Sequence, residues 1–226
     1  MTAGTYAVIA TDANGCTISS STTISEPTVL SLSLTVGSNV SCNGGNDGSA
    51  TATISGGTAG YSFLWDAAAG SQTSATASNL TAGTYFVTVT DANACSIVDN
   101  ITITEPIVLT ANISLGNNVS CNGGNDGAAT VLVNGGTPDG SGDYQYLWSA
   151  STGFQTTATA TSLSAGLHTV TVTDDNNCNT TAAIAITEPP VLQLNVLVNA
   201  NVSCNGGSDA SATAMPSDGT PAYAYL

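Results

Sequence analysis

Residues 80–90 read Leu-Thr-Ala-Gly-Thr-Tyr-Phe-Val-Thr-Val-Thr, and these eleven residues carry the clearest indication of the fold. From Tyr85 onward, side chains suited to a core alternate with others, which is the period-two pattern of a half-buried strand. The Leu-x-x-Gly-x-Tyr sequence before it has the form of a tyrosine corner, in which a Tyr hydroxyl bonds to backbone a few residues upstream. The stretch therefore predicts an immunoglobulin-like β-sandwich.

The features of this stretch belong to a unit that recurs along the chain. Ser41-Cys42-Asn43-Gly44-Gly45-Asn46-Asp47-Gly48 returns at 120–127 and, weakened, at 203–210, so its cysteines lie 79 (121 − 42) and 83 (204 − 121) residues apart. Cys16, Cys95 and Cys178 keep the same two spacings. A fixed period of this size predicts an array of small domains. The four extra residues of the longer period fall within 138–143, as expected for a lengthened surface loop.

The Glu-Pro pairs at 26–27, 105–106 and 188–189 set the predicted boundaries. Residues 27–105 and 106–188 are complete repeats, the second with the four-residue insertion. Residues 1–26 are the C-terminal part of a truncated repeat and residues 189–226 the N-terminal part of another, which predicts a window on a longer polypeptide. Alternating runs predict strands at 30–36, 50–54, 61–65, 85–90 and 97–103. With no helical periodicity, we expect an all-β chain of tandem immunoglobulin-like sandwiches, each of seven or so strands, arranged end to end.

The charge balance excludes several classes of partner. The chain has no Lys or Arg and fifteen acidic residues, giving a net charge of −15. Phosphate contacts need Lys or Arg, which argues against nucleic-acid binding and against adhesion to anionic membranes. The acids sit in turns and junctions, where solubility and mutual repulsion are the favoured role. No stretch approaches the ~18 apolar residues of a membrane span.

Few residues are candidates for a site. Four aspartates in turns are weak calcium candidates, but Asx turns are the favoured interpretation: Asp47, Asp91, Asp126 and Asp174. Trp65 and Trp148 are expected in the core, and Tyr6 and Tyr85 in tyrosine corners. The only histidine, His168, stands where the other repeats have Tyr, which indicates packing and not catalysis. We find no catalytic triad and no phosphate-binding loop, and we predict no enzyme activity and no cofactor.

Several motifs in fixed order resemble the SprB repeat. They are Cys-Asn-Gly-Gly-Asn-Asp-Gly, then Gly-Gly-Thr before an aromatic strand ending in Trp, then Leu-x-Ala-Gly-Thr-Tyr-x-Val-Thr-Val-Thr-Asp-Ala-Asn-x-Cys, then Thr-Glu-Pro. The resemblance runs over essentially the whole chain. His168, Ala94 and Ala210 depart from the pattern, at positions that concern packing or turns. The resemblance implies a large secreted surface protein of the Bacteroidetes group, similar to gliding-motility adhesins exported by the type IX system, in which the repeats form the stalk.

An exported chain with regularly spaced cysteines suggests disulfides. In the predicted sandwich, Cys42 lies near the first hairpin turn and Cys95 in the last, at opposite ends of strands spanning ~20–27 Å, whereas bridged Cα atoms lie ~5.5 Å apart. In an end-to-end array, the first-hairpin end of one sandwich abuts the last-hairpin end of the next, so a Cys42–Cys178 bridge across the junction is preferred. The alternative pairs Cys42 with Cys95 and Cys121 with Cys178 inside each repeat. Free thiols come third, and nothing favours zinc, because the chain has no C-x-x-C and only one His.

Three functions remain open at this point. The leading hypothesis is a non-enzymatic stalk or filament segment of an extracellular, cell-surface adhesin. In the second, the repeats bind polysaccharide or surfaces directly through loops that differ between repeats, such as residues 138–143. In the third, the array is a spacer for an enzyme domain outside this sequence. Exposed strand edges make self-association or lateral filament assembly credible.

Overall fold

The computed structural model describes all residues from 1 to 226 and is all-β apart from one short 3₁₀ helix. The chain divides into two compact units, unit 1 (Met1–Glu105) and unit 2 (Pro106–Leu226), and the division falls within a Glu-Pro pair. Every sheet is small and antiparallel. No helix has the length and apolar composition of a membrane span.

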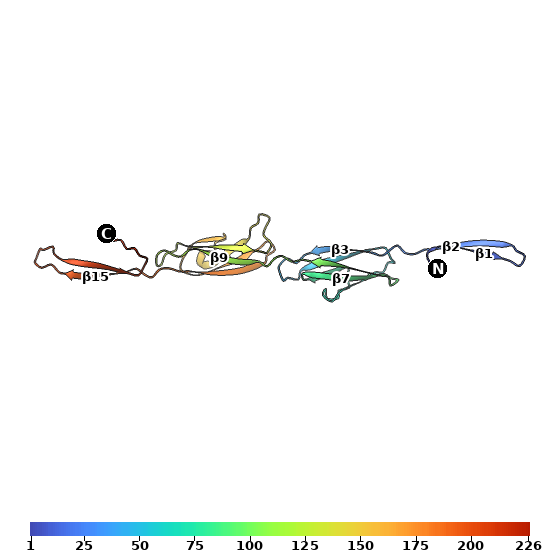
Figure 1. Cartoon of the computed structure of the whole chain (residues 1–226), viewed down its shortest axis with the longest axis horizontal. Helices are drawn as coiled ribbons and strands as arrows, with labels where there is room; N and C mark the ends of the chain where they lie inside the picture. The colour runs from blue at the N-terminus through green and yellow to red at the C-terminus, as the bar shows by residue number, and fades with distance from the viewer. The chain divides into compact units, whose positions relative to one another are not determined.

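Unit 1 holds one complete sandwich and one hairpin. The strands are β1 (Gly4–Thr11), β2 (Thr17–Ile24), β3 (Ser31–Ser38), β4 (Gly48–Ser55), β5 (Ser62–Trp65), β6 (Thr76–Leu80), β7 (Gly83–Thr90) and β8 (Ser96–Ile103). The sandwich has two three-stranded sheets, ordered β3-β4-β6 and β5-β7-β8, while β1 and β2 pair with each other. Figure 1 shows β3 and β7 in the two opposite layers. This strand order is that of an immunoglobulin-like sandwich without its fourth strand.

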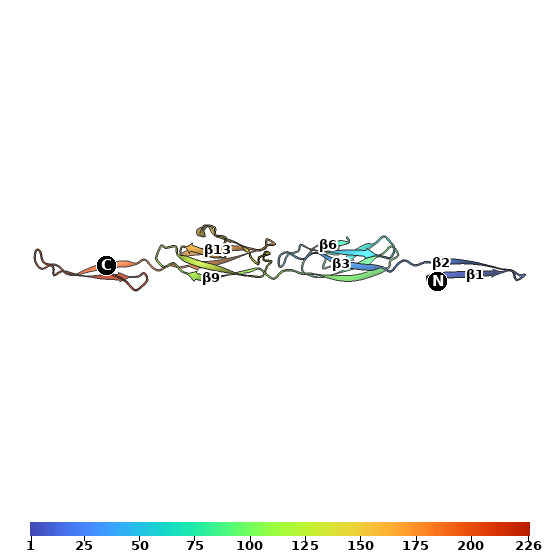
Figure 2. The same ribbon diagram turned by 90° about the horizontal axis from the view of Figure 1, so that it is seen from above.

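Unit 2 has the same two parts in the opposite order along the chain, a complete sandwich followed by a hairpin. Its elements are β9 (Thr110–Asn117), β10 (Gly127–Asn134), β11 (Gln145–Trp148), η1 (Ala150–Thr152), β12 (Thr159–Leu163), β13 (Gly166–Thr173), β14 (Asn179–Ile186), β15 (Gln193–Ala200) and β16 (Ser211–Ser217). The sheets are β12-β10-β9 and β11-β13-β14, and β15 pairs with β16. Figure 2 shows β9 and β13 in separate layers.

Each sandwich closes over a core centred on a tryptophan. Trp65 and Trp148 are fully buried, and their indole N–H groups donate to Ser74 O at 3.0 Å and to Thr157 O at 2.9 Å. Strands β4 and β6 supply buried alanines, and β7 supplies alternate buried residues, of which Val87 is one. The hairpin β1–β2 has no second sheet, so Val8, at the place of Val87, is 65% exposed.

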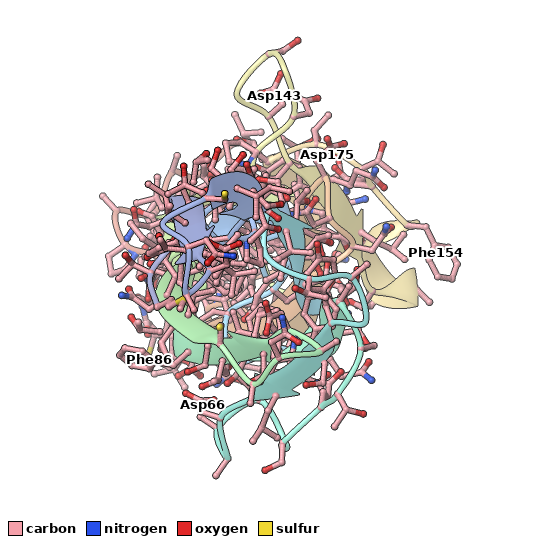
Figure 3. The ribbon with its side chains drawn as sticks, turned by 90° about the vertical axis from the view of Figure 1, so that its right-hand side faces the viewer. Asp66, Phe86, Asp143, Phe154 and Asp175 are labelled. Carbon is pink, nitrogen blue, oxygen red and sulfur yellow. The ribbon has the colours of Figure 1, made fainter.

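The prediction of an all-β chain of tandem sandwiches is confirmed. The strand count differs, because each complete repeat has six strands and not seven. Between β5 and β6 the chain forms turns instead of a strand: Asp66 N–H donates to Phe86 O at 2.9 Å, and the Asp66 carboxylate accepts the Phe86 N–H at 3.1 Å. Both residues are labelled in Figure 3. Strand β6 itself was not predicted, because Thr76–Leu80 alternates weakly.

Candidate functional site

The loop Cys-Asn-Gly-Gly that joins β3 to β4 has its shape fixed by two glycines. Gly45 N–H donates to Cys42 O at 2.9 Å, which closes a tight turn. Gly44 has φ +75°, a left-handed conformation that favours glycine. A Cβ on Gly45 would lie 2.9 Å from a Val40 methyl carbon. The first glycine is therefore needed for backbone conformation and the second for space.

An aspartate closes the same loop in each of its three copies. Asp47 accepts the Ser41 N–H at 3.0 Å, and Asp126 and Asp209 accept Ser120 and Ser203 in the same way at 2.9 and 3.0 Å. The Ser41 hydroxyl also donates to Asp47. These bonds favour the ionised carboxylate, so the serine hydroxyl and then the serine N–H lower the pKa of each aspartate.

In repeat 1 (residues 27–105), this loop holds the end of the last strand. Val40 N–H donates to Thr104 O at 2.9 Å, and Thr104 N–H donates to the Asn39 side-chain oxygen at 2.9 Å. One residue later, the Glu105 carboxylate accepts the Gly44 N–H at 2.6 Å. We call this set of contacts the exit clamp, because it fixes the chain where it leaves the sandwich.

Repeat 2 (residues 106–188) builds the same exit clamp. Thr187 is bonded by Val119 N–H at 3.0 Å and by the Asn118 side chain at 2.9 Å, and Glu188 accepts the Gly123 N–H at 2.6 Å. A further bond follows, in which the Asn122 amide donates to Pro189 O at 3.0 Å. The chain is thus held on both sides of the Glu188–Pro189 bond.

At the other end of each sandwich, an aspartate joins two loops. Asp91, 5% exposed, accepts the N–H groups of Thr58, Asn93 and Cys95, each at 2.9 Å. These bonds lower the pKa of Asp91, with the Thr58 N–H as the largest cause. Asp174 makes the equivalent bonds to Thr137, Asn176 and Cys178 at 2.8 to 3.0 Å.

The insertion in repeat 2 forms a turn of the same kind as this aspartate turn. Asp139 accepts the N–H groups of Ser141 and Asp143 at 2.8 and 2.9 Å, and its own N–H donates to Asp143 O. The N–H groups of Asp143 and then Ser141 lower the pKa of Asp139. Figure 3 shows Asp143 in a loop that projects from unit 2. The insertion is therefore an ordered turn that completes its own hydrogen bonds.

The tyrosine corner occurs three times, twice with Tyr and once with His. Tyr85 OH donates to Thr81 O at 2.9 Å, and Tyr6 OH donates to Thr2 O at 2.8 Å. At the same place in repeat 2, His168 is 1% exposed, with Nε2 2.8 Å from Ser164 O and Nδ1 3.1 Å from the Ser151 hydroxyl. A neutral imidazole fits both contacts, with Nε2–H donating and Nδ1 accepting.

The six cysteines fall into two classes. Cys42 and Cys178 are disulfide-bonded, whereas four cysteines are exposed free thiols: Cys16, Cys95, Cys121 and Cys204. In unit 1, Cys42 lies in the exit-clamp loop, beside the end of β8. Cys95 precedes β8, so the eight residues of that strand, roughly 26 Å, separate the two. In unit 2, Cys178 precedes β14 and so lies at the end of the sandwich opposite its exit clamp. The pairing of Cys42 with Cys178 stays a prediction.

The calcium candidates do not converge. Asp47 and Asp126 bond to serines in exit-clamp loops, and Asp91 and Asp174 bond to backbone at the opposite ends of their sandwiches. Nowhere in residues 1–226 do three His, Cys, Asp or Glu side chains gather so that they could hold a metal ion. Sequence reasoning missed the roles of Glu105 and Glu188. Their only signal was that every glutamate of the chain precedes proline at a boundary.

Comparison with known protein families matches three segments of the sequence to one repeat type. The SprB repeat model matches residues 34–70, 117–153 and 198–226. Each match starts in the first strand of a repeat and includes the Ser-Cys-Asn-Gly-Gly loop that follows this strand. No curated protein matches the chain.

Proposed function

Because this chain is built from SprB repeats, we propose that it is a structural segment of the stalk of a large, secreted cell-surface adhesin. SprB repeats are structural repeats and not a catalytic family, which supports a non-enzymatic role. The finer proposal is that the adhesin serves surface attachment or gliding motility, with export by the type IX system. In this role the repeats supply length and mechanical resistance.

The exit clamp is the observation that carries this proposal. It occurs in both complete repeats with the same glutamate-to-glycine bond at 2.6 Å. A stalk under tension transmits force along the chain, which enters each sandwich before its first strand and leaves after its last. The clamp ties the outgoing strand to the loop after the first strand. Extending a repeat therefore requires breaking these bonds together.

Pulling on the chain by its termini tests the proposal. With all cysteines reduced, so that tension reaches both exit clamps, we expect the double variant Glu105→Ala, Glu188→Ala to unfold at lower force than the parent chain, because each repeat has lost one charge-assisted bond from its exit clamp. Glu26→Ala is the matched control, since Glu26 is the remaining Glu-Pro glutamate and the truncated repeat at residues 1–26 contains no exit-clamp loop. Equal unfolding forces in the parent and the double variant would contradict the proposal.

We further propose that Cys42 and Cys178 form a bridge across the junction between the repeats. The support is that both are disulfide-bonded, that Cys42 lies at the exit end of repeat 1, and that Cys178 lies at the entry end of repeat 2. Such a bridge would withhold 136 (178 − 42) residue steps from extension, roughly 490 Å at ~3.6 Å per residue. Reduction during pulling should release this length. An unchanged final length would exclude the bridge.

Direct binding of polysaccharide is the second candidate, and one residue favours it. Phe154 is 61% exposed with φ +57°, where repeat 1 has Ser71 with φ +52°. The fold therefore does not require an aromatic residue there. If the loops of repeat 2 bind glycans, Phe154→Ser should reduce retention of the chain on a polysaccharide column. Equal retention of the parent and Phe154→Ser would leave the stalk as the better account.

A further inference from the structure

Two of the five Asn-Gly pairs in the chain differ from the others in what holds the glycine N–H. The pairs begin at residues 14, 43, 122, 134 and 205. Gly44 and Gly123 donate to the carboxylates of Glu105 and Glu188, both at 2.6 Å. Gly15 donates to a backbone carbonyl, and the N–H groups of Gly135 and Gly206 make no hydrogen bond within residues 1–226. The two exceptional pairs are those of the complete exit clamps.

Asn-Gly is the peptide sequence that loses its side-chain amide most readily, because glycine leaves the backbone nitrogen unhindered. The glycine nitrogen gives up its proton and attacks the asparagine Cγ. A new C–N bond forms, the bond to the side-chain nitrogen breaks and ammonia leaves. Water then opens the cyclic imide to aspartate or isoaspartate. The rate depends on how easily the glycine N–H is deprotonated.

In the exit clamp, a carboxylate opposes that deprotonation. A charge-assisted bond at 2.6 Å stabilises the N–H form, and the negative oxygen disfavours an anion on the bonded nitrogen. We propose that Asn43 and Asn122 are modification sites held in check by the glutamate of their own exit clamp. Deamidation then proceeds at these two residues when the glutamate withdraws, as Glu188 does when the outgoing chain is pulled out of its exit clamp.

The modification has a mechanical consequence in repeat 2. The Asn122 amide donates to Pro189 O at 3.0 Å, beside the contact between Glu188 and Gly123. A carboxylate in place of this amide cannot donate to a carbonyl, and it would stand near the Glu188 carboxylate. A deamidated clamp therefore does not close again. Loss of the amide converts a reversible opening into a permanent one.

Peptide mass spectrometry of aged protein tests the proposal. The parent chain, Glu105→Ala and Glu26→Ala are incubated in mildly alkaline buffer, and the deamidated fractions at Asn43 and Asn122 are followed over time. We expect Glu105→Ala to deamidate at Asn43 about tenfold faster than the parent, a factor that corresponds to about 1.4 kcal/mol. The rate at Asn122 in the same molecules should not change, and Glu26→Ala should match the parent at both residues.

Two outcomes would overturn the proposal. An unchanged rate at Asn43 would mean that the glutamate does not protect, and a slower rate would mean that it acts as a base. If Glu105→Ala unfolds repeat 1, Glu105→Gln carries the test, since it keeps a neutral acceptor and should give an intermediate rate. The parent chain in urea supplies the unprotected rate at Asn43, which must exceed the native rate. The stalk proposal is tested separately by the unfolding forces.

Discussion

At the scale of single residues, the two complete repeats solve one packing problem in two ways. In repeat 1 the corner residue is Tyr85, and in repeat 2 it is His168. Ala68 of repeat 1 stands at the position that Ser151 has in repeat 2. The Ser151 hydroxyl lies 3.1 Å from Nδ1 of His168, whereas the Tyr85 ring carries no second polar atom to satisfy. The exchange of Tyr for His at the corner and the exchange of Ala for Ser at the position of Ser151 are therefore coupled.

A double-mutant cycle tests this coupling. Ser151→Ala should destabilise repeat 2 by about 1–3 kcal/mol, because it leaves the buried Nδ1 without a donor. In the background of His168→Tyr, the same change should cost close to nothing. The coupling energy should exceed roughly 0.5 kcal/mol. Urea unfolding followed through the indole N–H signal of Trp148 isolates repeat 2, and additive effects would show that the two residues are independent.

Most of the features that were predicted correctly from the sequence depend on residues close together in the chain. The alternation around Val87 and the corner at Tyr85 are written in consecutive residues, so they could be read directly. The bond between Glu105 and Gly44 joins residues 61 positions apart, and no periodic pattern marks it. Strand β6 was missed for another reason. Its sequence is short and polar, and it pairs with β4 because of its place in the sheet and not because its own residues alternate.

At the scale of elements, the loops are held by carboxylates that accept backbone N–H groups. Five aspartates in such turns have a pKa below the ordinary value: Asp47, Asp91, Asp126, Asp139 and Asp209. With no Lys or Arg in the chain, hydrogen bonds take the place that ion pairs have elsewhere. The loops therefore depend on the ionised state of these side chains.

This dependence predicts a loss of stability in acid. A carboxylate whose pKa is lower in the folded chain stabilises the fold fully above its unfolded pKa of about 3.9. That stabilisation disappears as the pH falls from there through the folded pKa. We expect the free energy of unfolding in urea to be constant near neutral pH and to decrease below about pH 4. Ser41→Ala should flatten the decrease for repeat 1, because it removes the main cause of the low pKa of Asp47. A free energy that is the same at acid and neutral pH would refute this account.

At the scale of the whole molecule, the charge pattern gives salt a single direction of effect. The chain carries a net charge of −15 without one Lys or Arg, so added salt has no Lys or Arg ion pairs to weaken. It can only screen repulsion among the carboxylates, over a Debye length of ~10 Å at 0.1 M. The melting temperature should therefore rise steadily from low to physiological sodium chloride. A fall in melting temperature over this range would mean that repulsion does not limit stability.

Calcium at matched ionic strength separates screening from binding. The candidate aspartates direct their oxygens to N–H groups, as with Asp91 and its three donors, which leaves fewer lone pairs for a cation. We therefore expect calcium chloride and sodium chloride of equal ionic strength to give the same melting temperature. Asp91→Asn should lower the melting temperature equally in both salts, since it disturbs the turn and not a metal site. A calcium-specific increase that Asp91→Asn abolishes would instead make this turn a calcium site, and the stability of repeat 1 would then depend on the calcium concentration.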